Sequence, residues 1–238
     1  MKSGNRFAVV VTAEHASLKI PDRYRGLGLS AQQQRSHIAW DEGSVSLARE
    51  IARQLHAPLV EGAVSRLVID LNRSLHHRRV IPAVAFGVPV PGNEAISAEE
   101  RTRRIRLYYE PFRSGAFTEI NRGVTSTGRC VHISVHTFTP RLNGVTRPLD
   151  LAVLYDPRRK REAELGERLA ASMSAAGFRV RRNFPFRGVN DGHTTGLRRK
   201  FSDRRYAGIE IELSQALLGE WRVAVPIVSS QCRAVLSR

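Results

Sequence analysis

Phe7-Ala8-Val9-Val10-Val11 is an apolar, mainly β-branched stretch that leads to Glu14-His15. Two further runs have the same character: Val131 to Val135 leads to His136, and Ile209-Glu210-Ile211-Glu212 carries two carboxylates. Such runs favour β-strands. In an open α/β sheet, sites assemble in the crevice outside the carboxyl ends of the strands. The three runs therefore predict a sheet that carries a His/carboxylate metal centre of the kind found in hydrolases.

Helical patterns lie between these runs. Apolar residues at helical spacing predict a helix over residues 43–55, and Ser30 and Ser97 each begin a capping box. Further strands are expected at residues 59–60, 67–69, 151–155 and 178–182, and further helices at residues 97–121, 161–176 and 225–236, with loops at residues 74–93 and 183–196. Strands that alternate with helices predict an α/β fold with a mainly parallel or mixed central sheet flanked by helices.

The length and composition are those of a globular protein. A chain of 238 residues is in the range of one domain, so we expect a single catalytic domain over residues 1–238. No stretch approaches the roughly 20 apolar residues that span a bilayer. The first residues lack the long apolar core of an export signal, so a cytoplasmic location and no membrane partner are expected.

The charge balance raises a second class of function. The chain has 38 basic and 22 acidic residues, a net charge of +16, and only 4 of the basic residues are lysines. A basic nucleic-acid-binding protein is therefore an alternative. However, no nucleic-acid motif is present, and the arginine clusters are not interleaved with stacking aromatics. We expect no specific nucleic-acid partner, only weak polyanion binding at low salt.

Two histidines are the first candidates for metal ligands. His15 follows the first apolar run, and His136 ends the second, where it shares one strand face with His132 and Ser134. Two imidazoles and a carboxylate with an open fourth position form a recurrent catalytic zinc set. A structural role for His15 is the alternative. Cysteine ligands are not indicated, because the two cysteines lack CxxC spacing.

The acidic ligand has two candidates. Asp41 is the first, although it could instead cap the helix that begins near Gly43. Glu14 is the second because it adjoins His15, but neighbours on a strand point to opposite faces.

Glu210 and Glu212 are the candidates for a general base. They lie two apart on an otherwise apolar strand and so share one face. Buried carboxylates need a partner or a metal, and burial raises the pKa as a base requires. An edge strand with a solvated face is the alternative.

Substrate contacts are expected from two other segments. Arg73 offers the planar fork that binds a carboxylate with two hydrogen bonds, and Asn72 adds an amide. Thr194 and Thr195, in a glycine-flanked segment, could supply hydroxyl contacts. A plain surface loop is the alternative for the threonines.

Several segments, in order from about residue 8 to residue 218, resemble N-formylglutamate amidohydrolases and their relatives. They are Glu14-His15-Ala16-Ser17 with Ile20-Pro21, His37 to Asp41, Ser65 to Arg73, Pro91-Gly92-Asn93, Tyr108-Tyr109 with Pro111-Phe112, His136 to Pro140, Leu154-Tyr155-Asp156 and Glu210-Ile211-Glu212. The resemblance implies a zinc-carboxypeptidase-like phosphorylase/hydrolase fold. It also implies hydrolysis of N-formyl-L-glutamate to formate and L-glutamate, a late step of histidine breakdown.

The resemblance also implies roles for individual residues. His15 and His136 correspond to metal-binding histidines and Asp41 to the acidic ligand. The carboxylate-binding group corresponds to Arg66, Asn72 and Arg73, and the base to Glu212 rather than Glu210. The implied cofactor is a divalent metal, with zinc expected and cobalt or manganese also compatible with these ligands. The implied partner is a small N-acyl amino acid, and deacylation of a different N-acyl amino acid is the alternative.

Three positions depart from the pattern of the better-studied branch. Glu14 stands where proline is usual, His193 where an aromatic residue is commoner, and Glu210 where glutamine is common. We therefore expect a divergent branch of the family. The sequence leaves the oligomeric state open.

Overall fold

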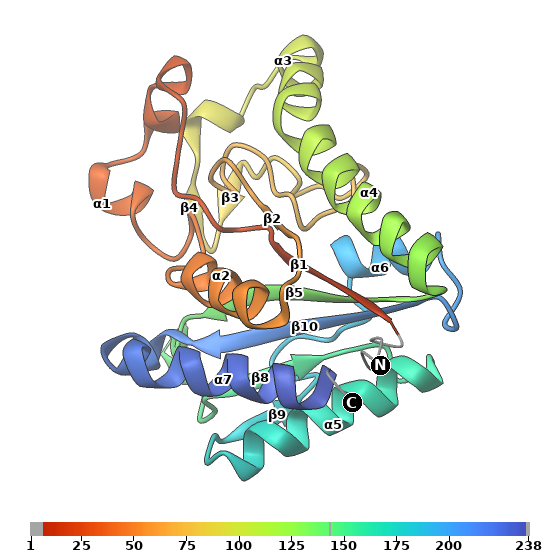
Figure 1. Cartoon of the computed structure of the whole chain (residues 1–238). Helices are drawn as coiled ribbons and strands as arrows, with labels where there is room; N and C mark the ends of the chain where they lie inside the picture. Colours follow the sequence, from red (N-terminus) through yellow and green to blue (C-terminus); the bar gives the residue numbers. More distant parts are fainter. Residues whose placement is uncertain (1–6, 143, 237–238) are drawn as a thin grey trace.

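A six-stranded, mainly parallel sheet forms the centre of the protein (Figure 1). The computed structural model describes residues 7–142 and 144–236; the segment before residue 7, on which the expectation about an export signal depends, lies outside this range. β8 runs antiparallel to β10, and every other pairing in the sheet is parallel. In spatial order the strands are β2 (Leu59–Glu61), β1 (Ala8–Ala13), β5 (Cys130–Phe138), β10 (Tyr206–Ser214), β8 (Leu151–Leu154) and β9 (Val180–Arg182). The predicted α/β fold class is confirmed.

Helices cover both faces of the sheet. In Figure 1, α2, α5 and α7 lie on one side, and α4 and α6 lie on the other. The α-helices are α1 (Ala31–Gln34), α2 (Ser44–Leu55), α3 (Ala98–Arg104), α4 (Glu110–Thr127), α5 (Lys160–Ala175), α6 (His193–Arg198) and α7 (Trp221–Leu236). Among the described residues, no helix combines the length and apolar character needed to cross a membrane.

Short elements complete the structure around this core. Two small hairpins, three 3-10 helices and one π-helical turn lie in the connections. They are β3 (Val84–Ala85) with β4 (Val88–Pro89), β6 (Arg141–Leu142) with β7 (Val145–Thr146), the 3-10 helices Asp22–Gly28, Pro91–Asn93 and Gln215–Glu220, and the π-helical turn Ile105–Tyr109.

The two faces of the central strands differ in chemistry. Ile133 and Val135 of β5, with Ile209 and Ile211 of β10, pack into the main apolar cluster against α2, α5 and α7. Alternate positions along the same strands carry buried polar side chains: His132, Ser134 and His136 of β5, and Glu210 and Glu212 of β10. Because side chains alternate across a strand, these polar groups share the face that α4 and α6 cover. This face positions the candidate site.

α4 is longer than the sequence indicates. The predicted end near residue 121 is wrong, because the helix continues to Thr127 and stops at Gly128, whose φ is +80°. Glycine adopts this left-handed conformation without a Cβ penalty. Pro111 follows directly after the π-helical turn Ile105–Tyr109, and the backbone stays helical from Ala98 to Thr127, so the proline does not end the helix; the local change from the α to the π pattern accompanies it.

Two other expectations are wrong. The strand predicted at residues 67–69 is a turn, in which Val68 N–H donates to Ser65 O, and its three side chains are buried in a second apolar cluster. Apolar residues can thus be buried without a strand partner. The loop predicted at residues 183–196 contains the start of α6. That short helix brings His193 and Thr194 into the interior.

Candidate active site

The carboxyl ends of β1, β5 and β10 deliver the candidate residues to one cavity. The parallel register places Glu212 opposite His136 and Glu210 opposite Ser134. The cavity has a volume of about 250 Å³. Its lining includes both carboxylates of β10 and the three predicted metal ligands, His15, Asp41 and His136.

His15, Asp41 and His136 converge on one point. Asp41 Oδ2 lies 3.2 Å from His15 Nδ1 and 2.9 Å from His136 Nδ1, and the two ring centroids are 5.1 Å apart. All three residues are buried. Asp41 does not cap α2, because the N-cap is Gly43 and no side chain bonds there. Instead the Asp41 N–H donates to His15 O, which fixes the aspartate beside the histidine.

These three residues fit a divalent metal. His15 Nε2 lies 2.8 Å from Asp70 Oδ1, so its two ring nitrogens face two carboxylates. Burial, reinforced by the charge of Arg66, lowers the pKa of His15 to about 4, so at neutral pH the ring carries only one proton. One nitrogen therefore faces a carboxylate with no proton between them. A cation at that point would satisfy both groups.

The hydrogen bonds around His136 indicate which of its nitrogens faces Asp41. The Ser134 hydroxyl donates to Glu14 Oε2 at 2.8 Å, and Ser134 Oγ lies 3.0 Å from His136 Nε2. Since the serine proton is used on Glu14, Nε2–H of His136 donates to Ser134. This arrangement leaves His136 Nδ1 as the nitrogen that faces Asp41 and that would bind a metal.

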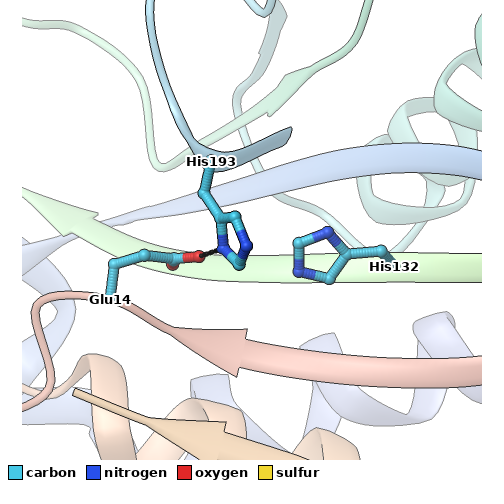
Figure 2. A group of neighbouring side chains, drawn as sticks. All are labelled: Glu14, His132 and His193. Carbon is cyan, nitrogen blue, oxygen red and sulfur yellow. Dashed lines mark hydrogen bonds and ion pairs between the residues drawn. The ribbon is translucent and has the colours of Figure 1, made fainter. Parts of the chain in front are cut away.

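Glu14, the alternative acidic ligand, points elsewhere. β1 ends at Ala13, and the Glu14 carboxylate lies beyond His136, with Oε2 3.4 Å from His136 Nε2. Its Oε1 lies 2.8 Å from His193 Nδ1 (Figure 2). Asp41 is therefore the carboxylate that lies between the two candidate histidines.

Two residues that the sequence reasoning gave no role complete the surroundings of the histidines. Asp70 orients His15. Burial alone would raise the pKa of Asp70, but His15 and Arg66 outweigh burial and hold this pKa well below its usual range. His193 comes from α6 and contacts Glu14. Asp70 was detectable as a carboxylate beside Asn72 and Arg73, whereas His193 lies in a segment read as a loop.

Glu210 and Glu212 share the polar face as predicted, but their environments differ. Glu210 accepts a hydrogen bond of 2.5 Å from the Thr194 hydroxyl. Burial raises the pKa of Glu212 from its usual value, although His136 opposes the shift. A carboxylate with a raised pKa beside candidate metal ligands is suited to accept a proton.

Cationic groups form another wall of the cavity. Arg66 Nη2 contacts Asp41 Oδ1 closely, and its Nε is buried without a hydrogen-bond partner. Arg73 donates from Nη1 to Asp191 O at 2.9 Å, and Asn72 Nδ2 lies 3.4 Å from His136 Nε2. The cavity lining also contains three arginines that were not predicted from the sequence: Arg79, Arg147 and Arg187. An anionic small molecule suits these surroundings.

Thr194 and Thr195 do not belong to the cavity lining. Thr194 is buried and bonds Glu210, while Thr195 Oγ1 donates to Asn190 O at 2.7 Å. Thr194 therefore supports a carboxylate of the cavity. A direct substrate contact of either threonine stays a prediction.

A family model described as N-formylglutamate amidohydrolase matches residues 7–218. The chain belongs to this family. It is therefore an amidohydrolase, and the expected resemblance is confirmed. No curated protein matches the chain at a significant level.

Two solved structures are similar to this amidohydrolase over nearly its whole length. The gene product Atu2144 from Agrobacterium tumefaciens is 31% identical with a TM-score of 0.85, and the match covers 97% of this chain and 91% of that one. The N-formylglutamate amidohydrolase from Ralstonia eutropha JMP134 is 18% identical with a TM-score of 0.67, and the match covers 98% and 94% of the two chains. At 18% identity the likeness concerns the fold.

Proposed function

We propose that this amidohydrolase is metal-dependent and hydrolyses N-formyl-L-glutamate to formate and L-glutamate. One observation carries the proposal: the Nδ1 atoms of His15 and His136 converge on Asp41 Oδ2 in a cavity that also holds Glu212. The substrate follows from the family and from the arginines of the cavity, which suit an anionic amino acid. Formate and glutamate as products would place the reaction late in histidine breakdown.

His15, Asp41 and His136 would hold the metal, for which we propose zinc because two imidazoles and one carboxylate are a common catalytic zinc set. When bound, the ion would polarise the amide carbonyl and acidify a water. Asp70 would keep the His15 ring oriented through Nε2, and Ser134 would do the same for His136.

Glu212 would act as the general base. Its raised pKa allows it to take a proton from the attacking water and to pass that proton to the leaving nitrogen. Arg73, with Arg66 and Asn72, would bind the carboxylate of the amino acid and so fix the direction of attack.

A substrate panel with zinc-loaded protein tests the proposal. Formate release from N-formyl-L-glutamate should exceed acyl release from N-formyl-L-alanine and N-acetyl-L-glutamate, and removal of the metal with a chelator should abolish it. Faster turnover of another N-acyl amino acid would support the alternative substrate with the same chemistry. Full activity in the metal-free protein would refute the metal mechanism.

A further inference from the structure

A second cluster of metal-binding side chains lies on the polar face of the sheet, beyond His136. Glu14, His132 and His193 are 0%, 0% and 1% exposed, and one donor atom of each lies within 4.8 Å of the others. Glu14 follows β1, His132 lies in β5 and His193 begins α6. Figure 2 shows the His193 ring between the other two side chains. None of the three lines the cavity of the candidate active site.

The contacts within the cluster are short and involve a fourth group. His193 Nδ1 lies 2.8 Å from Glu14 Oε1. The hydroxyl of Thr12, which is fully buried, lies 2.7 Å from Glu14 Oε1 and 2.7 Å from His132 Nε2. Two imidazoles, a carboxylate and a hydroxyl are thus gathered around one point.

One atom in the cluster lacks a hydrogen-bond partner, and the Glu14 carboxylate, which accepts hydrogen bonds from Thr12, Ser134 and His193, has no described arginine or lysine beside it. His193 Nδ1 donates to Glu14, so its Nε2 carries a lone pair, and this buried atom has no hydrogen-bond partner. The described ion pairs of Glu14 involve histidines only and no lysine or arginine. Buried carboxylates are normally paired with a charge or bound to a metal, and a buried lone pair without a donor is costly. One cation would satisfy both groups.

We propose that Glu14, His132 and His193 bind a second divalent metal ion, of the zinc type, in addition to the ion of the candidate active site. Two histidines and a carboxylate are a zinc donor set. Because the three residues are buried and do not line the cavity, this ion has a positioning role and not a catalytic one. It ties α6 to β1 and β5, and the next residue of α6, Thr194, holds Glu210 by its hydroxyl.

Metal counting tests the proposal. The full chain is stripped with a chelator, refilled with Zn²⁺, separated from free ions and measured by elemental mass spectrometry. We expect two ions per wild-type chain, one in His193→Asn, one in Asp41→Asn and none in the double variant. In His193→Asn the amide can still donate to Glu14 Oε1 but supplies no imidazole. His76→Asn, which removes an exposed histidine, is the control and should retain both ions.

The outcomes separate this inference from the proposed function. A single wild-type ion that Asp41→Asn removes and His193→Asn retains would overturn the second site, leaving the cluster a hydrogen-bond network. A single ion with the opposite dependence would support the second site and remove the metal from the proposed mechanism. If His193→Asn does not fold, His132→Gln replaces it, since its amide can keep the contact with Thr12. A wild-type count of two supports the second site even without either variant, and at a count of one the loss or retention of the ion in Asp41→Asn shows which site holds it.

Discussion

Glu212 and Glu210 differ in their surroundings although they lie two residues apart on β10. Thr194 holds Glu210 by a hydrogen bond, whereas burial raises the pKa of Glu212. We predict that Glu212→Gln lowers kcat roughly 10²- to 10⁴-fold, the usual contribution of a general base. Formate release measures this, with metal content as a check that the site is intact. Glu210→Gln is the matched comparison, and a larger loss in that variant would make Glu210 the base.

The proposed role of Glu212 also predicts how the activity depends on pH. A general base works only when it is ionised, so with Glu212 as the proposed base we expect activity above the pKa of Glu212 and its loss as the pH falls through that pKa. Because burial raises this pKa, the acidic limb of kcat/KM should lie above the usual glutamate value of about 4.3. A pH profile of the wild type gives the limb, and the residual activity of Glu212→Gln should lack it. An identical limb in both proteins would contradict the assignment.

At the level of single residues, the sequence predicts the candidate metal ligands better than the residues that contact them. Strand periodicity places His132, Ser134 and His136 on one face, and the structure agrees. The contact between Glu14 and His193 joins residues 179 positions apart and depends on where a short helix begins. No local pattern encodes such a contact. Both residues are departures from the family pattern, which is the one signal that could have linked them.

A buried ion pair holds α6 against α5 and the central sheet. Arg198 Nη2 lies 2.8 Å from Glu162 Oε1 of α5, and their side chains are 6% and 0% exposed. The same guanidinium donates to Gly208 O of β10 at 2.9 Å, and Gly208 N donates to Glu162 Oε2 at 3.0 Å. One pair therefore links two helices and a central strand.

Loss of this arginine should destabilise the protein strongly. Arg198→Met removes the shorter of the two described ion pairs of the buried Glu162 carboxylate and leaves only Arg159, whose Nε lies 3.4 Å from Glu162 Oε2; breaking a buried pair costs up to about 3–5 kcal/mol. Urea unfolding measures the free energy of unfolding. Arg182→Met is the control, because the Arg182–Glu167 pair is 59% and 58% exposed, and such pairs contribute about 0–1 kcal/mol. Equal losses in the two variants would show that Arg198 has no special structural role.

Elements with a strong period were predictable from sequence, and those that depend on packing were not. β5, β10, α2 and α5 lie close to their expected positions, since alternation or an apolar helical face specifies each. The turn at residues 67–69 has a strand-like composition, but its side chains enter the second apolar cluster without a neighbouring strand. The short α6 lacks a long apolar period. Tertiary contacts, not local propensity, decide both segments.

At the scale of the whole molecule, the two faces of the sheet differ in composition, and the candidate site residues lie on one of them. The apolar face packs against α2, α5 and α7, and the polar face carries both clusters of histidines and carboxylates. The alternation of side chains along β5 and β10 makes this separation possible. A single domain over residues 1–238 stays a prediction, because the family match covers residues 7–218 only.

The net charge of +16 predicts a salt-dependent interaction that is unrelated to the active site. Several exposed arginines already pair with acidic neighbours, as in Arg49–Glu61, Arg122–Glu119 and Arg179–Asp150, so part of the charge is balanced locally. We therefore expect weak DNA binding whose affinity falls linearly with salt on logarithmic axes and is equal for unrelated duplexes. Fluorescence anisotropy with two duplexes between about 50 and 200 mM salt measures this dependence. If one duplex were preferred roughly 10³-fold at the higher salt, the protein would read sequence, and a nucleic-acid function would have to be added to the hydrolase.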